Sequence, residues 1–504
     1  RRQRQMCIRD SIQGDHIQVL KRDDGTHKNI RLIDKDNIHN NRLQVINQYV
    51  AEGIRLNRYD VTILVNGLPM VHVELKRRGV DLREAFNQIE RYQRDSFWSG
   101  CGLFEYVQLF VISNGTHTKY YSNTTRNGHL DEQRGRRPGR RRTSNSFAFT
   151  SWWADARNRL IEDLPAFTRT FFAKHTLLNI LTRYCVFDVD QKLLVMRPYQ
   201  IAAAERIIER IRTATQYRRL GSIDAGGYIW HTTGSGKTLT SFKTAQLACE
   251  LPGVEKVLFV VDRKDLDYQT MREYDRFEKG AANSNASTAI LKRQLEDAKA
   301  RIIVTTIQKL NNFVSAHKRH EVYGRHVVII FDECHRSQFG DMHDAITKAF
   351  RQYNLFGFTG TPIFAENASS TGNPKRRTTQ QTFGDNLHTY TIVDAINDRN
   401  VLPFRVDYIR TFHRADQMPD KDVSAIDTEK ALLADERIGK VTQYILQHFN
   451  QKTLRCGGGD YTHKGKRLRG FNALFATESI AAARAYYEAF KTQQATLPEA
   501  HRLK

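Results

Sequence analysis

Two short runs in the first part of the chain have an apolar residue at every second position, namely VTILV at 61–65 and VHVEL at 71–75. Alternation with a period of two is typical of a half-buried β-strand. Asn66-Gly67 lies between the two runs, and Asn-Gly in this position is a strong signal for a tight turn. The pattern therefore predicts a β-hairpin over residues 58–76. If its turn is centred near Gly67–Leu68, Asp60 lies across from residues 75–76.

Two helical patterns follow the hairpin. Residues 82–94 form one expected helix, and residues 147–190 form a helical, aromatic stretch that we interpret as a connector. We expect the large side chains of the connector to be core rather than a binding platform. They are Trp152, Trp153, Phe167, Phe171, Phe172, Leu177, Leu178 and Leu181.

Beyond residue 190, short apolar runs are separated by helical segments. Strands that alternate with helices in this way predict a parallel sheet in an α/β domain. A last apolar run precedes an Ala-rich helix from Ser479, which indicates the opening of another α/β unit. The predicted strands are Tyr228–Trp230, Val257–Val261, Ile302–Val304, Val327–Phe331, Leu355–Phe358 and Phe471–Phe475.

An Arg-dense polar stretch, roughly residues 123–146, separates the first region from the connector. Its centre, RGRRPGRRR at Arg134–Arg142, contains two glycines and a proline and therefore predicts a loop. A solvated linker and an arm that contacts phosphates both fit this composition. The expected divisions of the chain are residues 1–146, 147–190, 191–395 and 396–504.

The overall charge of the chain favours a protein that binds a polyanion. The 504 residues include 78 Lys and Arg against 55 Asp and Glu, a net charge of +23. A globular protein this basic most often meets a polyanion, usually nucleic acid. We expect no membrane span, because no apolar run reaches about 18 residues. The six cysteines are scattered without a CxxC pair, which argues against a zinc site or a disulfide framework and indicates a reducing cytoplasm.

A phosphate-binding loop is predicted at residues 231–238, HTTGSGKT, between an expected strand and an expected helix. Small residues let backbone N–H groups curl around a phosphate, and a lysine can reach the β- and γ-phosphates of ATP. A threonine hydroxyl can bind the accompanying Mg²⁺. A threonine stands where this loop usually has its first glycine. The candidate ATP-binding residues are Gly234, Ser235, Gly236, Lys237 and Thr238.

An acidic pair strengthens this prediction. The apolar strand at 327–331 ends in Asp332-Glu333-Cys334-His335. A carboxylate at the carboxyl end of a parallel strand lies beside the phosphate loop, so Asp332 can hold Mg²⁺ and Glu333 can orient or deprotonate the attacking water.

Two further segments complete a set of motifs. RPYQ at 197–200 opens a helix, where Gln200 could read the edge of adenine, and TGTP at 359–362 follows a strand. With TGSGKT and DECH, these segments resemble superfamily 2 helicase-like motors. VVDRKDLDYQ at 260–269 resembles motif Ia of that family, and GFNALFATES at 470–479 resembles motif IV.

The resemblance implies RecA-like parallel-sheet motor lobes, the first over 191–395 and the start of a second over 396–504. It also implies roles for individual residues. His335, Thr359 and Thr361 would couple the ATP site to a moving interface, and Arg263 and Lys264 would contact the nucleic-acid backbone. Motifs V and VI do not occur before Lys504, and the chain starts with Arg1-Arg2 rather than Met. We therefore expect a fragment, or a chain whose remainder is absent.

The hairpin carries a second candidate site. It gathers Asp60, Glu74 and Lys76 into one patch, because residues 74 and 76 share a face. Two carboxylates can hold Mg²⁺, which polarises a scissile phosphate and lowers the pKa of a bound water, and a lysine can position that water. An exposed hairpin face with a salt bridge would contain the same residues.

The D-x₁₃-E-x-K pattern resembles PD-(D/E)xK nucleases, with Tyr59 where those proteins often have proline. Gln88 and Tyr92 are four apart on the expected helix and so share a face. They resemble the QxxxY motif of nuclease domains fused to DNA motors, where they would support the metal site or contact DNA. An ordinary helix with a half-buried tyrosine is the alternative.

A nuclease followed by a motor is the order found in the restriction (HsdR-type) subunits of type I restriction-modification enzymes, and the chain resembles that family over nearly its whole length. The stretches that carry the resemblance are NGLPMVHVELK, FVISNGTHTKYYSN, FAFTSWWAD, LLVMRPYQ and VLPFRVDY. Type III restriction subunits have the nuclease after the motor, so the order argues against them.

The family implies an ATP- and Mg²⁺-dependent enzyme of the prokaryotic cytoplasm. It would translocate double-stranded DNA, cleave unmodified DNA, and assemble with methyltransferase and specificity subunits. Three alternatives stay open. They are a superfamily 2 DNA translocase without nuclease activity, an RNA helicase, and a scaffold without catalysis, although the hairpin carboxylates oppose the second and intact GSGKT and DECH oppose the third.

Overall fold

The computed structural model describes residues 17–97, 99, 102–125, 146–187, 193–261, 288–336, 341–368, 377–409, 432–455, 460–463 and 466–497. The basic segment Arg134–Arg142 and the expected DNA contacts Arg263 and Lys264 lie outside these residues. The fold divides into two compact units, residues 1–403 and 404–504. None of the helices in the described part of the chain has the length and apolarity needed to cross a membrane.

The predicted hairpin is confirmed as strands β4 (Asn57–Val65) and β5 (Leu68–Leu75). Asn66 and Gly67 connect them with φ values of 50° and 86°. Two consecutive positive φ values are the conformation for which Asn-Gly is preferred in a two-residue hairpin turn. The turn is therefore centred on Asn66–Gly67, one residue earlier than expected.

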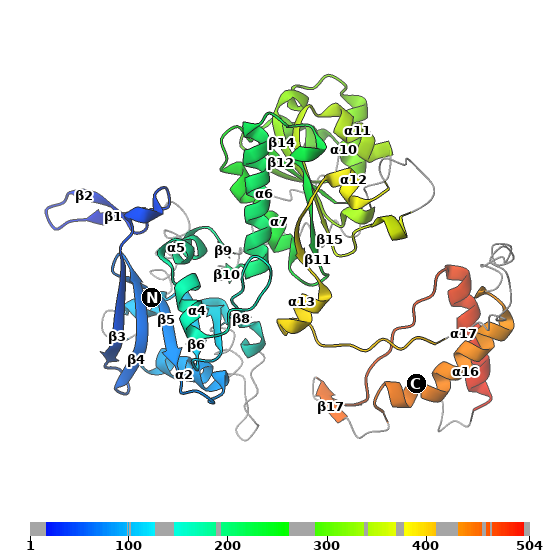
Figure 1. The fold of residues 1–504 in the computed structure, drawn as a ribbon, viewed down its shortest axis with the longest axis horizontal. Coiled ribbons are helices and arrows are strands. Elements are labelled where there is room, and N and C mark those ends of the chain that lie inside the picture. Colours follow the sequence, from blue (N-terminus) through cyan, green and yellow to red (C-terminus); the bar gives the residue numbers. More distant parts are fainter. Residues whose placement is uncertain are drawn as a thin grey trace. The chain divides into compact units, whose positions relative to one another are not determined.

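The hairpin belongs to a six-stranded sheet with the order β3-β4-β5-β6-β7-β8, which we call the N-terminal sheet (Figure 1). Its two faces have separate cores. In β6, Leu109 and Val111 pack into one core, and Phe110 and Ile112 pack with α2 into the other. The remaining bounds are β3 Leu43–Ala51, β6 Leu109–Ser113, β7 Thr118–Ser122, β8 Ser151–Trp152 and α2 Leu82–Asp95; a separate hairpin is formed by β1 Ile17–Lys21 and β2 His27–Arg31.

The connector contains helices α4 (Leu164–Phe171) and α5 (Lys174–Thr182), which cover the face of the N-terminal sheet opposite α2. Most of the expected core residues are buried there, Phe167 and Phe171 completely. The connector begins differently from the expectation, because β8 at residues 151–152 extends the N-terminal sheet. A short antiparallel pair, β9 (Cys185–Phe187) and β10 (Leu193–Val195), leads to α6 (Pro198–Gln216).

The predicted parallel sheet is confirmed. Its order is β13-β12-β14-β15-β11-β16, and every neighbouring pair is parallel. Five of its strands were predicted, whereas the edge strand β16 was missed because NLHTY is too polar to stand out. The bounds are β11 Gly227–His231, β12 Lys256–Val261, β13 Ile302–Thr306, β14 His326–Phe331, β15 Gln352–Thr359 and β16 Asn386–Tyr390.

Helices cover both faces of the parallel sheet. Along β12, Val257 and Phe259 pack into the core that contains α6 and α7, whereas Leu258 and Val260 pack into the core that contains α9 and α10. Burial on both faces explains why these strands are continuous apolar runs in the sequence. The helices are α7 Lys237–Cys249, α9 Thr288–Glu296, α10 Ile307–Ala316, α11 Asp341–Ala349, α12 Thr379–Phe383 and α13 Ile392–Asn397.

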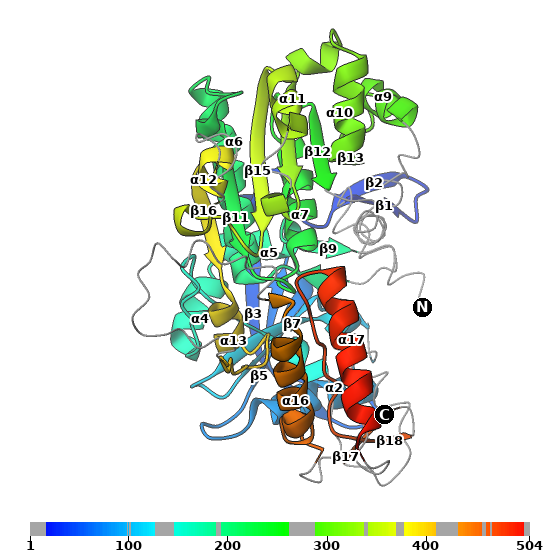
Figure 2. The same cartoon turned by 90° about the vertical axis from the view of Figure 1, so that its right-hand side faces the viewer.

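The second unit contains helices α16 (Asp435–Lys452) and α17 (Ile480–Ala495), which pack side by side through Ile438, Ala482 and Tyr486 (Figure 2). A small hairpin is formed by β17 (Asp460–His463) and β18 (Lys466–Arg469). The helix after Ser479 is confirmed, and the Ser479 hydroxyl caps it by accepting from the amide of Ala482 at 3.1 Å.

The strand predicted at Phe471–Phe475 is wrong. This segment has no regular structure, and Phe471 and Phe475 are exposed. A strand needs a partner for its backbone N–H and C=O groups, and no described strand in this unit pairs with the segment.

The hairpin turn gives a test of the local fold. Gly67→Ala places a side chain at a φ of 86° without a steric neighbour within 4 Å, so conformational strain of about 1–2 kcal/mol is its main effect. We expect hydrogen exchange of the β4 and β5 amides to become roughly fivefold to thirtyfold faster, as measured by mass spectrometry.

The matched control is Gly324→Ala. This glycine also has open space around its added Cβ, but its φ is not positive. Exchange in its neighbourhood should stay unchanged. Equal effects of the two substitutions would contradict the assigned turn.

Candidate functional site

Asp60 and Glu74 lie beside each other at the end of the hairpin that is distant from the turn. The pairing of β4 with β5 ends at Val61 opposite Val73. Asp60 precedes Val61 on β4, and Glu74 follows Val73 on β5. The Asp60 Oδ2 atom accepts a hydrogen bond from the backbone amide of Leu75 at 2.8 Å.

This register corrects the expectation that Asp60 lies across from residues 75–76. The turn lies at Asn66–Gly67, and the pairing shifts by one residue between Ile63 and Leu64. Such an irregularity inserts an extra residue into one strand and re-aims the side chains that follow. Continued by one residue, the observed register places Asp60 opposite Glu74.

Lys76 completes this group, as the sequence predicted. Its Nζ atom lies 2.7 Å from Glu74 Oε1 and 3.3 Å from the carbonyl oxygen of Leu75. The Glu74 side chain is completely buried, because β5 lies between β4 and β6 and α2 covers this face of the sheet. A buried carboxylate needs a compensating cation, and Lys76 supplies one.

The environment of Asp60 disfavours its charged form. Burial raises the pKa of the Asp60 carboxyl, the amide of Leu75 lowers it, and the charge of Glu74 raises it again, with smaller opposing contributions from Lys76 and His72. A second cation bound between the two carboxylates would remove this conflict.

Helix α2 brings Gln88 and Tyr92 to the same place. The Tyr92 hydroxyl donates to the carbonyl of Arg58 at 3.0 Å and lies 3.5 Å from Glu74 Oε1, and the Gln88 side-chain amide bonds to it. Burial, followed by the charge of Glu74, raises the pKa of Tyr92 to about 12. The hydroxyl is therefore a donor at neutral pH. The two residues that resemble QxxxY thus lie against the carboxylates.

His72 was missed by the sequence reasoning. Its ring is fully buried, with Nε2 at 3.6 Å from Glu74 Oε2, and it packs edge-on against the rings of Tyr59 and Tyr92. In the sequence, only its position two residues before Glu74 could have indicated a role for His72, since residues two apart on a strand share a face. Tyr59, which replaces the usual proline, bonds to the Ser96 hydroxyl at 2.6 Å and anchors this aromatic layer.

The donor set fits a magnesium ion. Mg²⁺ is usually bound by one or two carboxylates and completes its shell with waters and substrate phosphates. Glu74 Oε2 is buried and has no hydrogen-bond partner, so it is available as a ligand beside Asp60. The described residues contain no group of three or more His, Cys, Asp or Glu side chains that could hold a metal without such additional ligands.

The GSGKT segment forms a loop between β11 and α7. Gly234 and Gly236 have φ values of 81° and 79°, a conformation that glycine adopts without strain. Helix α7 begins at Lys237, so Lys237 and Thr238 lie in its first turn. The Ser235 hydroxyl is buried without a partner. An N-terminal helix turn with free N–H groups and an unsatisfied hydroxyl fits a nucleotide phosphate.

The acidic pair lies at this loop, as predicted. The Lys237 ammonium lies 3.1 Å from Glu333 Oε1, and the Glu333 amide donates to Asp332 Oδ1 at 3.0 Å. Glu333 has a φ of 42°, which costs energy for a residue with a side chain. This strained conformation turns Glu333 back toward the phosphate loop.

A chain of contacts continues from the acidic pair to TGTP. His335 Nδ1 lies 3.6 Å from Glu333 Oε2 and 2.9 Å from the Thr359 hydroxyl oxygen. The same hydroxyl oxygen accepts a hydrogen bond from the backbone amide of Thr361 at 3.0 Å. The three residues expected to act in coupling are therefore joined to each other and to Glu333.

Gln200 has partners that the sequence did not predict. Its side-chain amide donates to the carbonyl oxygens of Ser235 and Gly236 at 3.1 and 3.2 Å, and its Oε1 accepts from the amide of Arg197 at 2.9 Å. Tyr199 also donates to the Ser235 carbonyl, at 2.7 Å. In this structure Gln200 holds the phosphate loop, and both edges of its amide are occupied by the protein.

The comparisons with known proteins agree with this arrangement. Residues 6–129 match the family described as type I restriction enzyme R protein N terminus, and residues 199–437 match the SWI2/SNF2 ATPase family. The endonuclease subunit of type I restriction enzyme SauMSSORF170P from Staphylococcus aureus (strain MSSA476) is 43% identical over 477 residues, 94% of this chain and 46% of that protein.

A second relative is the C-terminal part of the endonuclease subunit of type I restriction enzyme MpnIIP from Mycoplasma pneumoniae. It is 48% identical over 204 residues, which cover 39% of this chain and 99% of that protein. Among solved structures, the type ISP restriction-modification enzyme LlaBIII bound to DNA is 18% identical with a TM-score of 0.29, over 42% of this chain and 16% of that one.

The chain spans about half the length of the first of these relatives, 46%. An N-terminal R-protein region and an ATPase region follow one another in the order that the motifs predicted, and the identity to the first relative extends over 94% of the chain. The chain belongs to the family of type I restriction enzyme endonuclease (HsdR) subunits.

Proposed function

We propose that the whole protein translocates double-stranded DNA at the expense of ATP and cleaves unmodified DNA in a Mg²⁺-dependent reaction. The observation that carries the cleavage proposal is the meeting of Asp60, Glu74 and Lys76 at the end of the hairpin, where Lys76 Nζ lies 2.7 Å from a fully buried Glu74 carboxylate.

In this proposal Asp60 and Glu74 hold the metal ion. Bound there, Mg²⁺ would polarise the scissile phosphate and lower the pKa of a bound water. Lys76 would position that water and stabilise the negative charge that develops on the phosphate. Tyr92, whose hydroxyl lies 3.5 Å from Glu74 Oε1, would help to position Glu74, and Gln88 would orient Tyr92. Fixing a metal ligand by a second layer of hydrogen bonds is typical of metal sites.

The ATP site would use the loop at residues 234–238, with Asp332 and Thr238 as the Mg²⁺ ligands. Lys237 would bind the β- and γ-phosphates, and its contact with Glu333 would be exchanged for the nucleotide. Glu333 would then be free to orient the attacking water. Because His335 lies next to Glu333 and is bonded to Thr359, a movement of Glu333 would reach TGTP. These contacts support a coupling role for His335, Thr359 and Thr361.

We infer the partner subunits from the family to which the chain belongs. A motor that tracks phosphates without reading bases needs a separate source of sequence recognition. We propose that methyltransferase and specificity subunits supply it, and that the complex acts in the prokaryotic cytoplasm. The net charge of +23 is suited to backbone contacts. Arg263 and Lys264 stay candidates for such contacts.

The nuclease assignment is tested by Asp60→Asn and Glu74→Gln in the full-length subunit within the assembled enzyme. Each removes one negative ligand with little change of shape. We expect cleavage of unmodified DNA to fall by at least about a hundredfold, measured by gel assay. ATP-driven translocation should persist, measured by displacement of a triplex-forming oligonucleotide.

Asp36→Asn is the matched control, because this aspartate lies in the same part of the chain with a side chain that is 80% exposed. It should cut at the rate of the unchanged protein. Undiminished cleavage by the Asp60 and Glu74 variants would reject the nuclease site and favour a translocase without nuclease activity.

The motor assignment is tested by Lys237→Ala. Without the ammonium, the nucleotide phosphates lose their charged partner and Glu333 loses its ion pair. We expect ATP hydrolysis, translocation and cleavage to be lost together. Lys292→Ala, at a half-exposed lysine on α9, should retain all three. Cleavage that continued without ATP in the Lys237 variant would contradict the proposed coupling of motor and nuclease.

A further inference from the structure

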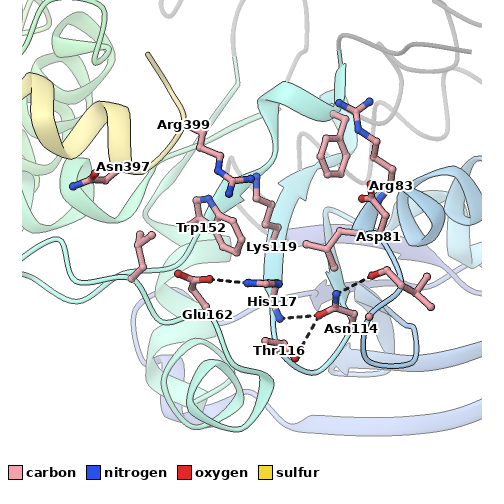
Figure 3. A pocket seen from close by; sticks show the side chains of 15 residues that line it. Asp81, Arg83, Asn114, Thr116, His117, Lys119, Trp152, Glu162, Asn397 and Arg399 are labelled. Atoms are coloured by element: carbon pink, nitrogen blue, oxygen red, sulfur yellow. Dashed lines mark hydrogen bonds and ion pairs between the residues drawn. The ribbon is translucent and has the colours of Figure 1, made fainter. Parts of the chain in front are cut away.

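A cavity of about 600 Å³ lies beside β7 and the start of α2, and none of the candidate site residues lines it (Figure 3). One wall belongs to the N-terminal sheet and to α2. The other wall is formed by Asn397, the last residue of α13, and by Arg399. Both residues follow the parallel sheet in the chain. The residues that matter here are Arg83, Lys119, Phe147, Trp152, Asn397 and Arg399.

Lys119 is the most unusual of these residues. It is only 8% exposed, and the described residues give it no ion pair with a carboxylate. Its Nζ atom lies 3.4 Å from the Thr150 hydroxyl oxygen, 4.5 Å from the centre of the Trp152 ring and 5.4 Å from that of Phe147. A buried ammonium without an anionic partner is costly, and aromatic rings compensate for only part of that cost.

Two arginines add to the positive charge. Arg83 stacks over Phe147 at 4.5 Å from the ring centre, so it shares this ring with Lys119. Arg399, with an exposed side chain, points into the same cavity beside Lys119 (Figure 3). Neither arginine forms an ion pair within the described part of the chain. Burial, and then the charges of Arg399, Arg197 and Arg83, lower the pKa of Lys119 to about 8.

The nearby carboxylates are engaged elsewhere. Glu162 lies 3.2 Å from His117, and Asp81 caps α2 by accepting from the amide of Arg83 at 2.9 Å. Asp398 accepts from the Tyr390 hydroxyl at 2.8 Å and is the last and smallest of the charges that act on Lys119. The cavity therefore gathers three cations without an anion committed to them.

We propose that this cavity is a phosphate-binding site, in which Lys119, Arg83 and Arg399 hold one phosphate group. Guanidinium groups match the geometry of phosphate oxygens, and a lysine ammonium adds a compact point charge. The site is separate from both candidate active sites. A phosphate held there would contact strand β7 and the segment after α13 together, and so would add a polar link between the N-terminal sheet and the residues that follow the parallel sheet.

The phosphate can come from the DNA backbone or from a free anion, and one experiment separates these sources. Inorganic phosphate is titrated by calorimetry into the full-length subunit without Mg²⁺. All proteins carry Lys237→Ala, so that the GSGKT loop does not contribute. The test variants are Lys119→Met, which keeps the length and apolar stem of the side chain, and Arg399→Gln, which changes an exposed residue and leaves the core intact. Lys292→Met is the control.

We expect the control to bind phosphate like its parent, and each test variant to bind at least about tenfold more weakly, as for the loss of one charged hydrogen bond. A 20-base-pair duplex that competes with phosphate would support the site with the DNA backbone as its source. Phosphate binding that the duplex leaves unchanged would support it with a free anion. Absence of binding to the parent, or equal affinity in the parent and Arg399→Gln proteins, would overturn the proposal.

Discussion

The placing of a half-buried carboxylate, Asp60, next to a fully buried one, Glu74, is the constraint on which the N-terminal part of this protein depends. Water is excluded from Glu74 but only partly from Asp60, and this partial burial raises the pKa of the Asp60 carboxyl. Such a pair is unstable unless cations and hydrogen-bond donors surround it. The chain supplies them through Lys76 and the amide of Leu75, and the hydroxyl of Tyr92 lies 3.5 Å from Glu74 Oε1. Each of these groups is positioned by a different feature, namely the register of the hairpin, the shift within it and the buried face of α2. The fold of this region therefore places the groups that stabilise two carboxylates next to each other.

The phosphate loop shows the same principle with the opposite sign of charge. This loop presents hydrogen-bond donors that suit an anion. Acceptor groups and side chains of the protein keep the loop in place. Glu333 meets Lys237, while Gln200 and Tyr199 hold the loop through its carbonyl oxygens. The two regions are also mechanically continuous, because one apolar core extends from the N-terminal sheet through α4 and α5 to α6, α7 and the parallel sheet. A close-packed core has low compressibility and transmits strain. This continuity gives the proposed coupling between motor and nuclease a physical route.

Periodicity in the sequence was sufficient for the elements that bury a regular pattern. The hairpin, α2 and five strands of the parallel sheet were predicted because their apolar residues repeat at the spacing of a strand or a helix. The edge strand β16 carries a weaker pattern and was missed, and Phe471–Phe475 is apolar but finds no partner strand among the described residues. The site residues follow the same division. Asp60, Glu74 and Lys76 were selected as candidates because their chemistry and their spacing coincide, and the hairpin brings them together. His72, the loop contacts of Gln200 and the buried charge of Lys119 depend on contacts between distant segments, which no local pattern encodes.

Metal binding by the hairpin can be measured without DNA, ATP or partner subunits. Mn²⁺ can replace Mg²⁺ as a paramagnetic probe, and its binding to the nucleotide-free full-length subunit can be followed by electron paramagnetic resonance. We expect a Mn²⁺ site that Asp60→Asn weakens strongly and that Asp332→Asn leaves in place, since we assign Asp332 to the proposed nucleotide site. Equal Mn²⁺ binding by the unchanged protein and the Asp60 variant would contradict the claim that the carboxylate pair is a metal site.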